Sequence, residues 1–264
     1  QFLADQTGVP CYVINVIQGN TDQIVTGGGT GASGSATVQN NATLVTVGMM
    51  IEAFTEYLAD KFQVTENDIR FDYETFRIAG SNLTPSMLDC AEMARIDGRQ
   101  DLLIHEATAE LQARSFPNGA HVAEVEVDPE TGVVRIERYT VVDDFGNLFN
   151  PMLVEGQVHG GVAQGIGQAI NEHVVYDQNG QLLTATFMDY GRPRAKDVPF
   201  LSFETEPIPS TANPMGVKGC GEAGTVGALA AVANAVQDAL WDKGVRQADM
   251  PFTPLRVWEM LQAS

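Results

Sequence analysis

Cysteines, cationic side chains and long apolar runs are all scarce in this sequence of 264 residues. The three cysteines, Cys11, Cys90 and Cys220, form neither a disulfide framework nor the closely spaced set that an iron–sulfur cluster requires. Only 15 Lys and Arg oppose 34 Asp and Glu, and the resulting net charge of −19 argues against nucleic acid as a partner. No run of 18 uninterrupted apolar residues occurs, so no membrane span is expected.

What the sequence does contain is typical of a globular enzyme. Its hydrophobic content of 44% is sufficient to bury one large core or two smaller ones. No secretory signal is visible, which favours the cytoplasm and leaves the periplasm open. The alternation of helical and strand patterns predicts a mixed α+β fold in two intertwined parts, residues 1–115 and 116–264.

The first part combines two helical segments with short strands around a glycine-rich loop. Apolar spacing and turn residues predict a helix over 1–7, a strand over 11–17, the loop at 27–35, a helix over 38–62, a strand over 75–79 and a helix start at 84–89.

The second part opens with a hairpin. Residues 121–127 and 133–142 alternate as strands, and the turn sequence Asp128-Pro-Glu-Thr-Gly132 joins them. A glycine-rich helix is predicted over 160–172, a strand over 181–188 and, after an irregular proline-rich stretch, a helix over 223–240.

The segment Asn213–Gly224 is the most informative part of the sequence. It places Glu222 among glycines at the start of the predicted helix 223–240, which is rich in Ala, Val and Leu and should be buried on nearly every side. A carboxylate near the interior, facing space that glycines leave open, suits a general base. The alternative is that Glu222 simply caps a core helix.

A second candidate site is the loop Ala32-Ser33-Gly34-Ser35. Small side chains expose backbone N–H groups, and two hydroxyls add further donors, which suits a pterin or phosphate ligand. The alternative is that Ser33 or Ser35 is an ordinary N-cap of the following helix.

Polar side chains on the predicted helix 160–172 form a third candidate. Gln164 and Gln168 share one face, beside a face that Gly161 and Gly165 make thin. An amide can pair with the edge of a heterocycle without adding charge. The alternative, a solvent-facing glutamine, is the commoner role for such a residue on sequence alone.

Two glycine patterns and four histidines do not support other site classes. Residues 29–34 and 219–224 both fit G-x-G-x-x-G, but neither directly follows a strand in a βαβ unit as a dinucleotide site requires. The four histidines lack metal-ligand spacing and are interpreted as structural: His105, His121, His159 and His173.

The order of several long motifs resembles one enzyme family. Residues 156–168 (Gly-Gln-Val-His-Gly-Gly onward) and 213–224 are similar to the molybdenum-binding large subunits of the xanthine dehydrogenase, aldehyde oxidase and carbon monoxide dehydrogenase family. The likeness extends to 121–132, to 144–151 and to the glycine-serine loop at 27–36. It covers nearly the whole chain and is interrupted mainly around residues 88–112.

The resemblance implies a molybdenum–molybdopterin cofactor without direct ligation of the metal by protein side chains. Glu222 would be the general base, with Ala32 and Glu222 near the molybdenum. Cys220 would be a small residue beside the site rather than a thiolate ligand. Many bacterial relatives have Arg where this chain has Gly34, which changes the local charge. The implied cofactor-binding residues are Ala32, Ser33, Gly34, Ser35, Gln164, Gly165, Gly219, Cys220 and Gly221, with Gln168 as a weaker candidate.

The implied reaction is hydroxylation of an aldehyde, an N-heteroaromatic ring or a purine with oxygen derived from water. Carbon monoxide is less favoured, because the family's copper-binding cysteine loop lies upstream of the segments seen here. Iron–sulfur clusters and flavin would belong to partner chains or segments, beside the remaining part of the molybdenum subunit. Two alternatives stay open: a non-catalytic half-subunit that supplies part of a cofactor pocket and an assembly surface, and an unrelated acidic binding module.

Overall fold

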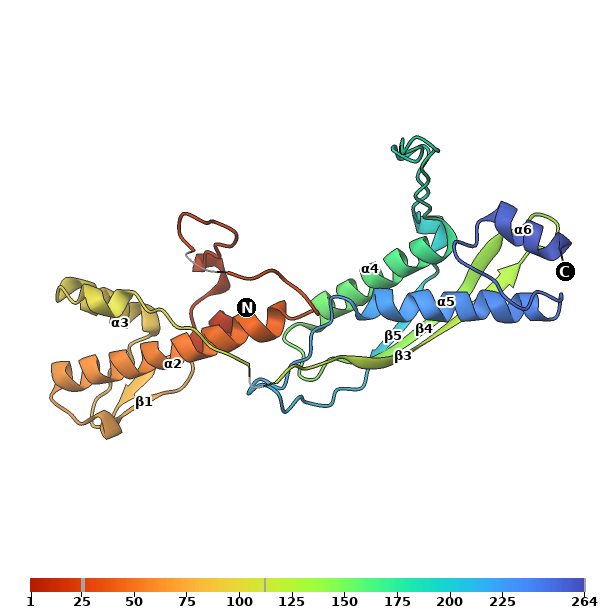
Figure 1. Cartoon of the computed structure of the whole chain (residues 1–264). Helices are drawn as coiled ribbons and strands as arrows, with labels where there is room; N and C mark the ends of the chain where they lie inside the picture. The colour runs from red at the N-terminus through yellow and green to blue at the C-terminus, as the bar shows by residue number, and fades with distance from the viewer. Residues whose placement is uncertain (25–26, 112, 264) are drawn as a thin grey trace. The chain divides into compact units, whose positions relative to one another are not determined.

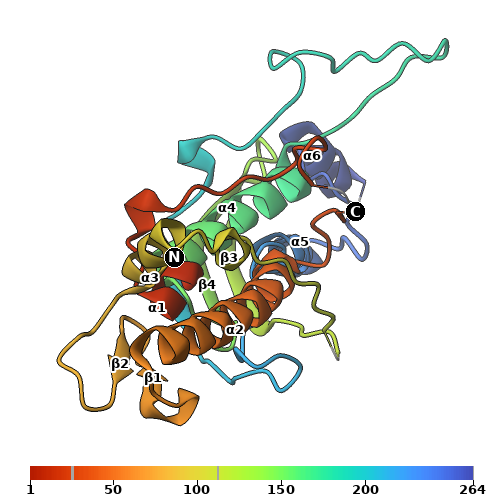
Figure 2. The ribbon, with the colours of Figure 1, turned by 90° about the vertical axis from the view of Figure 1, so that its left-hand side faces the viewer.

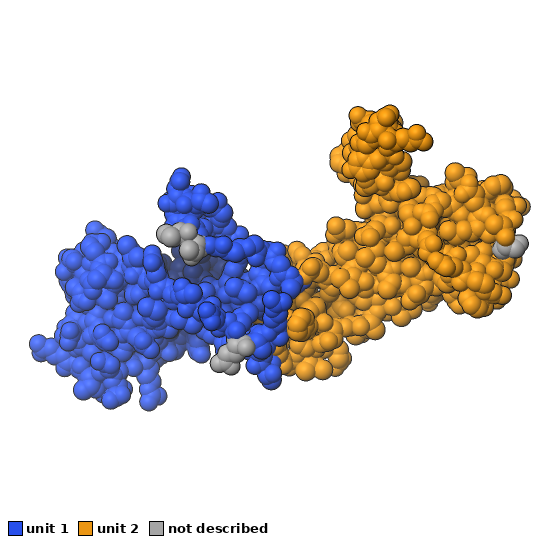
Figure 3. Space-filling model, in the orientation of Figure 1, with its two compact units in different colours: residues 1–114, 211–215 blue, residues 115–210, 216–264 orange. Residues whose placement is uncertain are grey.

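A computed structural model describes residues 1–24, 27–111 and 113–263 of the chain. The chain forms two compact units, coloured separately in Figure 3. The first contains residues 1–114 and 211–215, and the second contains residues 115–210 and 216–264. The parts expected from the sequence differ from these units mainly at 211–215, a short return of the chain into the first unit. The motif 213–224 is therefore divided between the two units at Gly216.

The first unit is built on the long helix α2 (Ser35–Phe62), which packs with α1 (Phe2–Thr7) and with the hairpin of β1 (Ile69–Phe71) and β2 (Phe76–Ile78) (Figure 1). Phe54 of α2 meets Phe76 of β2 edge to face in a core that also contains Leu58 and Cys90. Helix α3 (Met87–Ile96) begins with a capping box in which Ser86 and Asp89 accept each other's backbone N–H. The helix start predicted at 84–89 is thus confirmed.

Helix α2 also leaves a large part of its surface uncovered within the described chain. Val38, Val45 and Met49 are exposed. By length and composition α2 could cross a membrane, but the core helices of soluble proteins pass the same test, so this observation is weak. The absence of a membrane span stays a prediction from the sequence.

The second unit places two helices on a three-stranded sheet (Figures 1 and 2). Strand β3 (Asn118–Val127) pairs antiparallel with β4 (Val134–Asp144), and β5 (Leu201–Thr205) joins β4 in parallel. The Asp128 carboxylate closes the β3–β4 turn by accepting from the Glu130 N–H and the Thr131 hydroxyl. The predicted hairpin and its turn are confirmed.

Helices α4 (Pro151–Ile170) and α5 (Ala223–Trp241) pack closely because glycines face the contact. A Cβ atom on Gly161 would lie 3.0 Å from the Gly224 Cα, and one on Gly165 would lie 2.6 Å from the Ala228 Cβ. Both helices therefore approach nearer than larger side chains allow. Helix α5 also packs on β3, and the final helix α6 (Pro254–Gln262) lies against Gly132 at the end of the hairpin turn.

Three sequence predictions differ from the structure. Residues 11–17 form a short 3-10 turn, Cys11–Val13, and extended chain rather than a strand, and Tyr12, Val16 and Ile17 are exposed. Residues 181–188 belong to an arm that projects beyond the end of α4 (Figures 1 and 2), where one isolated bridge, Tyr176–Leu182, replaces the expected strand. Helix α4 begins at Pro151, well before residue 160, because the Asn150 side chain caps it.

Candidate functional site

The glycine-serine loop before α2 combines open space with a constrained backbone. Cβ atoms on Gly28, Gly29 and Gly31 would meet nothing within 4 Å. Two consecutive non-glycine residues, Ala32 and Ser33, have positive φ angles of 50° and 53°. Such conformations cost about 1–3 kcal/mol each and persist where the surrounding structure enforces them, frequently at ligand sites.

Local hydrogen bonds enforce this loop geometry and direct it into α2. The Gly34 N–H donates to the Gly31 carbonyl at 3.0 Å, and the Thr30 and Ser35 hydroxyls lie 2.6 Å apart. Gly34 is the N-cap of α2 and Ser35 its first residue, so the alternative in which Ser33 or Ser35 caps the helix is wrong. The first turn of a 28-residue helix then follows the loop directly, with N–H groups that have no intrahelical partner.

In the second unit, Gln164 is linked to the first turn of α5. The Thr225 hydroxyl lies 3.0 Å from the Gly161 carbonyl and 3.3 Å from the Gln164 Oε1, to both of which it is oriented as donor. This contact occupies the oxygen of the Gln164 amide and leaves its NH₂ group as the donor end on an exposed face of α4. Gln168 lies one turn further along the same face and is also exposed.

Gly165 has a packing role in the structure. It is buried against α5, where its missing side chain admits Ala228 and the Thr225 carbonyl. The close approach that this permits brings Gln164 to Thr225, three residues after Glu222. Gly165 therefore shapes the site by letting the helices meet.

The loop that leads to Glu222 is fixed to the end of β4 by a buried ion pair. The Lys218 ammonium contacts the Asp144 carboxylate, and both side chains are only 10% exposed. Asp144 also accepts from the Gly146 and Ile208 N–H groups, each at 2.9 Å. Burial alone would raise the pKa of Asp144, but these hydrogen bonds and the Lys218 charge together lower it.

A glycine contact completes this attachment. The Asn147 N–H donates to the Gly216 carbonyl at 2.9 Å, and the Lys218 N–H donates to the Phe145 carbonyl at 2.8 Å. A Cβ atom on Gly146, whose φ is +61°, would lie 2.1 Å from the Gly216 oxygen. The backbone around 216–218 thus has little freedom to move away from β4.

Glu222 occupies the N-cap position of α5 and is exposed in this chain, so the prediction of a buried carboxylate is wrong. The reason lies in how α5 packs. Its buried residues form one stripe at four-residue spacing, Gly224, Ala228, Val232, Val236 and Leu240, covered by α4 and the sheet. The opposite face, which includes Val226 at 67% exposure, is open. Apolar composition therefore overstated the burial of α5.

The residues beside Glu222 differ in burial. Gly219 is buried, Cys220 is half-buried and Gly221 is exposed. Burial raises the pKa of the Cys220 thiol, which favours the protonated form over a thiolate ligand. Within the described ranges 1–24, 27–111 and 113–263, no cluster of three His, Cys, Asp or Glu side chains is arranged to hold a metal ion.

Taken unit by unit, these residues fit a pterin cofactor. The loop in the first unit offers unobstructed glycines, a constrained backbone and a helix N-terminus, which suit close approach of a polar heterocycle or an anion. The second unit offers the amide donors of Gln164 on α4 and the carboxylate of Glu222 at the N-cap of α5, whose first turn contacts Gln164 through Thr225.

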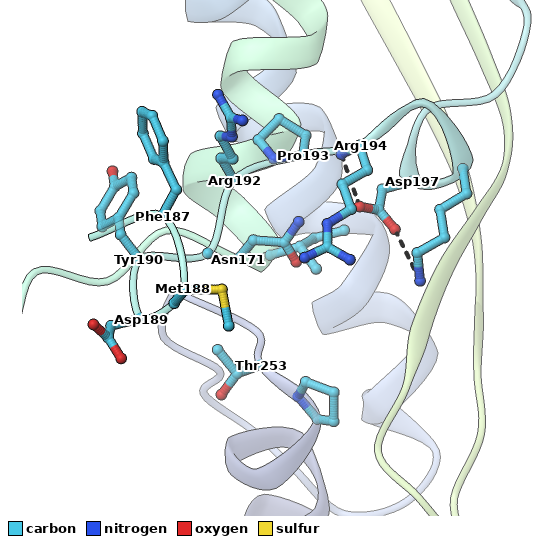
Figure 4. A pocket seen from close by; sticks show the side chains of 14 residues that line it. Asn171, Phe187, Met188, Asp189, Tyr190, Arg192, Pro193, Arg194, Asp197 and Thr253 are labelled. Carbon is cyan, nitrogen blue, oxygen red and sulfur yellow. Dashed lines mark hydrogen bonds and ion pairs between the residues drawn. The ribbon is translucent and has the colours of Figure 1, made fainter. Parts of the chain in front are cut away.

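A separate cavity of about 670 Å³ lies at the base of the projecting arm (Figure 4). Arg192 and Arg194 contribute to its wall, and the Arg192 guanidinium stacks 4.1 Å from the Phe187 ring centre. None of the sequence-predicted site residues lines this cavity.

Sequence reasoning missed three contacts that shape the site: Lys218–Asp144, Thr225–Gln164 and a buried pair formed by His121 and Asp143. Lys218 and Asp144 each lie in a motif that carries the family resemblance, but nothing in the sequence paired them. His121 was interpreted as a lone structural histidine.

Comparisons with known proteins identify the family of the chain. A family model described as "Molybdopterin cofactor-binding domain" matches residues 1–199. The carbon monoxide dehydrogenase large chain of Hydrogenophaga pseudoflava is 31% identical over 99% of this chain and 33% of its own length. The nicotine 6-hydroxylase large subunit of Paenarthrobacter nicotinovorans is 33% identical over 97% of this chain and 32% of its own length.

A solved structure of a Cu,Mo-CO dehydrogenase in its carbon monoxide-reduced state superimposes with a TM-score of 0.88 at 30% identity, covering 99% of this chain and 34% of that one. The chain belongs to the molybdopterin cofactor-binding domain family, within the molybdenum-binding subunits of the xanthine dehydrogenase and carbon monoxide dehydrogenase group. The predicted family and the mixed α+β fold are confirmed. The chain spans about a third of the length of the curated relatives it matches.

Proposed function

We propose that this chain supplies part of the cofactor site of a molybdenum hydroxylase, with Glu222 as the general base. The observation that carries the proposal is the Thr225–Gln164 contact, which joins the first turn of α5 to α4 three residues after Glu222. It joins a neutral donor on α4 to the first turn of α5, whose N-cap is the ionisable carboxylate of Glu222. This combination can hold the edge of a heterocycle and accept a proton beside it.

The bound molybdenum cofactor would supply the oxidising equivalents and the water-derived oxygen for hydroxylation. Within this chain, the Gln164 NH₂ group would donate to the pterin edge, and the loop 32–35 would present backbone N–H groups and hydroxyls to it. The Glu222 carboxylate would take up the proton that the attacking oxygen loses.

For the substrate we propose an N-heteroaromatic ring, with an aldehyde or a purine as the next classes to test. Nicotine 6-hydroxylase, whose named substrate contains such a ring, is similar to this chain over nearly its full length. A carbon monoxide dehydrogenase is similar to the same extent. Rates with pyridine-type rings, aldehydes, purines and carbon monoxide, measured side by side, distinguish these classes.

The proposed enzyme also needs the remaining sequence of the molybdenum subunit and electron-transfer partners. Because the relatives are about three times as long as the matched region, we propose that further segments share the cofactor site. We propose that iron–sulfur clusters and flavin reside on partner chains or segments, and that the pterin carries a cytosine nucleotide. Nucleotide analysis after cofactor release tests the last point directly.

A non-catalytic half-subunit is the competing proposal, since the chain covers a third of its relatives. The native mass of the assembly, measured with its molybdenum, iron and pterin content, tests both. A hydroxylase predicts stoichiometric molybdenum and pterin in the assembly and a turnover that depends on Glu222. A purely structural role predicts turnover that is indifferent to Glu222.

A further inference from the structure

A buried polar cluster lies on the sheet of the second unit, around His121. Strand pairing sets His121 of β3 opposite Val141 of β4, so Tyr139 and Asp143 are its diagonal neighbours on the same face. The His121 Nδ1 lies 2.8 Å from the Tyr139 hydroxyl, and the Nε2 lies 3.3 Å from the Asp143 Oδ1. The His121 and Asp143 side chains are only 6% and 3% exposed.

The backbone is adapted to hold this cluster. A Cβ atom on Gly119, which pairs with Asp143, would lie 1.8 Å from the Asp143 Oδ1, so only glycine leaves room for the carboxylate to turn toward His121. The other carboxylate oxygen, Oδ2, is buried without a hydrogen-bond partner in the described structure. A buried carboxylate with one unsatisfied oxygen is unfavourable, so its arrangement with His121 offsets only part of the burial cost.

The surroundings of Tyr139 determine which of its hydrogen-bonding roles is available. Burial, and then the negative charge of Asp143, raise the pKa of Tyr139, which keeps its phenolic proton. The phenol can then donate to His121 Nδ1, leaving the ring proton on Nε2 to face Asp143. His121 is thereby held in one ring orientation from both sides.

The His121 ring contacts α5 at Gly227. A Cβ atom on Gly227 would lie 2.5 Å from three atoms of the imidazole, Cγ, Nδ1 and Cε1, so the ring lies face-on against the helix backbone. Gly227 is five residues beyond Glu222, in the same helix. On its α4 side, the same part of α5 is fixed by Gly161 and by the Thr225 hydroxyl.

We propose that His121, held by Asp143 and Tyr139, is a positioning residue that sets the place of Glu222 through its contact with Gly227. Asp143 and its neighbour Asp144 then fix the chain on the two sides of Glu222. Asp144 holds the loop before Glu222 through Lys218, and Asp143 holds the helix after it through His121. This inference rests on the proposed role of Glu222 as the base.

An alternative is that the cluster only stabilises the sheet–helix contact. The positioning role and the structural role predict different effects of a substitution in the cluster. If His121 positions Glu222, disturbing its contact with Gly227 lowers kcat, because small misplacements of a catalytic group reduce rates strongly. If the cluster is merely structural, the defect resembles that of any other buried contact along α5.

The test uses the intact enzyme complex and three variants, normalised to molybdenum content. His121→Asn shortens the ring contact, and Gly227→Ala keeps every polar group but forces a methyl group against the imidazole. Val236→Ala removes a fully buried contact further along α5 and is the matched control. We expect the first two to lower kcat by about tenfold or more with KM and molybdenum content nearly unchanged. The control should lower Tm while leaving kcat within about twofold.

Equal kcat losses in Val236→Ala and the two test variants at equal loss of Tm would overturn the proposal, as would unchanged kcat in Gly227→Ala. If His121→Asn does not assemble, Gly227→Ala decides alone, since it retains the polar cluster. A parallel Glu222→Gln variant tests the role of Glu222 as the base separately from the positioning role of His121. Full activity in that variant refutes the base itself, whereas an inactive Glu222→Gln beside a fully active Gly227→Ala refutes only the positioning role.

Discussion

Lys218 and Asp144 form a buried ion pair that attaches the loop before Glu222 to the end of β4. Seventy-four positions separate the two residues in the sequence. The pair joins two segments that carry the family resemblance, residues 144–151 and 213–224. Asp144 in the first segment holds Lys218 in the second. The position of Glu222, the candidate base, therefore depends on Asp144, a residue distant from it in the sequence.

Lys218→Ala should destabilise the fold considerably. Asp144 would remain buried without its cation, a change that typically costs about 3–5 kcal/mol, and its two backbone hydrogen bonds favour the lower end. Lys61→Ala, which removes a partly exposed ion pair with Asp97, is the matched control and should cost much less, because solvent screens that pair. Urea unfolding of the two variants measures the difference. Equal losses would show that the Lys218–Asp144 pair contributes no more than a surface pair.

The same pair gives a pH dependence of definite sign. The pKa of Asp144 is lowered in the folded chain, so its ionised form stabilises the fold above its unfolded pKa of about 3.9. This stabilisation is lost as the pH falls through the lowered native pKa. The difference in Tm between the wild type and Asp144→Asn should therefore shrink between about pH 5 and pH 2. A constant difference over that range would contradict the assignment.

Glycines of α4 offer a matched pair of substitutions. Gly165→Ala places a methyl group 2.6 Å from the Ala228 Cβ and should destabilise by about 1–3 kcal/mol through overpacking. Gly160→Ala, on the open side of the same helix, should stabilise by up to about 1 kcal/mol because alanine favours helix. Thermal unfolding of the two variants should shift in opposite directions. A stabilised Gly165→Ala would show that the α4–α5 contact is looser than described.

Gln164→Ala should lower molybdenum retention in the assembled enzyme, because a donor to the pterin edge is lost and its partner is left unpaired. Thr225→Val, which removes the hydroxyl that orients the Gln164 amide, should have a smaller effect in the same direction. Gln168→Ala removes the weaker candidate on the next turn of α4 and should have the smallest effect of the three. Metal analysis after dialysis ranks the variants by the molybdenum that they retain. Unchanged retention in Gln164→Ala would show that this residue has a structural role only.

Local signals in the sequence predicted the elements that they determine. The Ser86–Asp89 capping box, the Asp128 turn and the apolar spacing of residues 38–62 each define a helix start, a hairpin or a helix without help from distant residues. Strand β5 was missed because it lies in a proline-rich stretch and depends on β4 for its pairing. The strand expected at 11–17 has the right alternation, but no strand in the described chain pairs with it.

The candidate site shows the same division. Motifs drew attention to Gln164, Glu222 and the loop 32–35, since residue type and order are visible in the sequence. Burial of Glu222 was overstated because the small side chains of α5 suggested packing on every side, whereas α4 and the sheet cover one stripe. The His121–Asp143 and Lys218–Asp144 pairs depend on sheet register and chain return, which composition does not encode.

The rate of Glu222→Gln in the intact, molybdenum-loaded complex tests the central claim most directly. The substitution preserves size and removes the proton acceptor, so kcat should fall by about a hundredfold or more while molybdenum and pterin content stay near the wild-type level. Turnover within about tenfold of wild type at equal metal content would contradict the assignment of Glu222 as the general base.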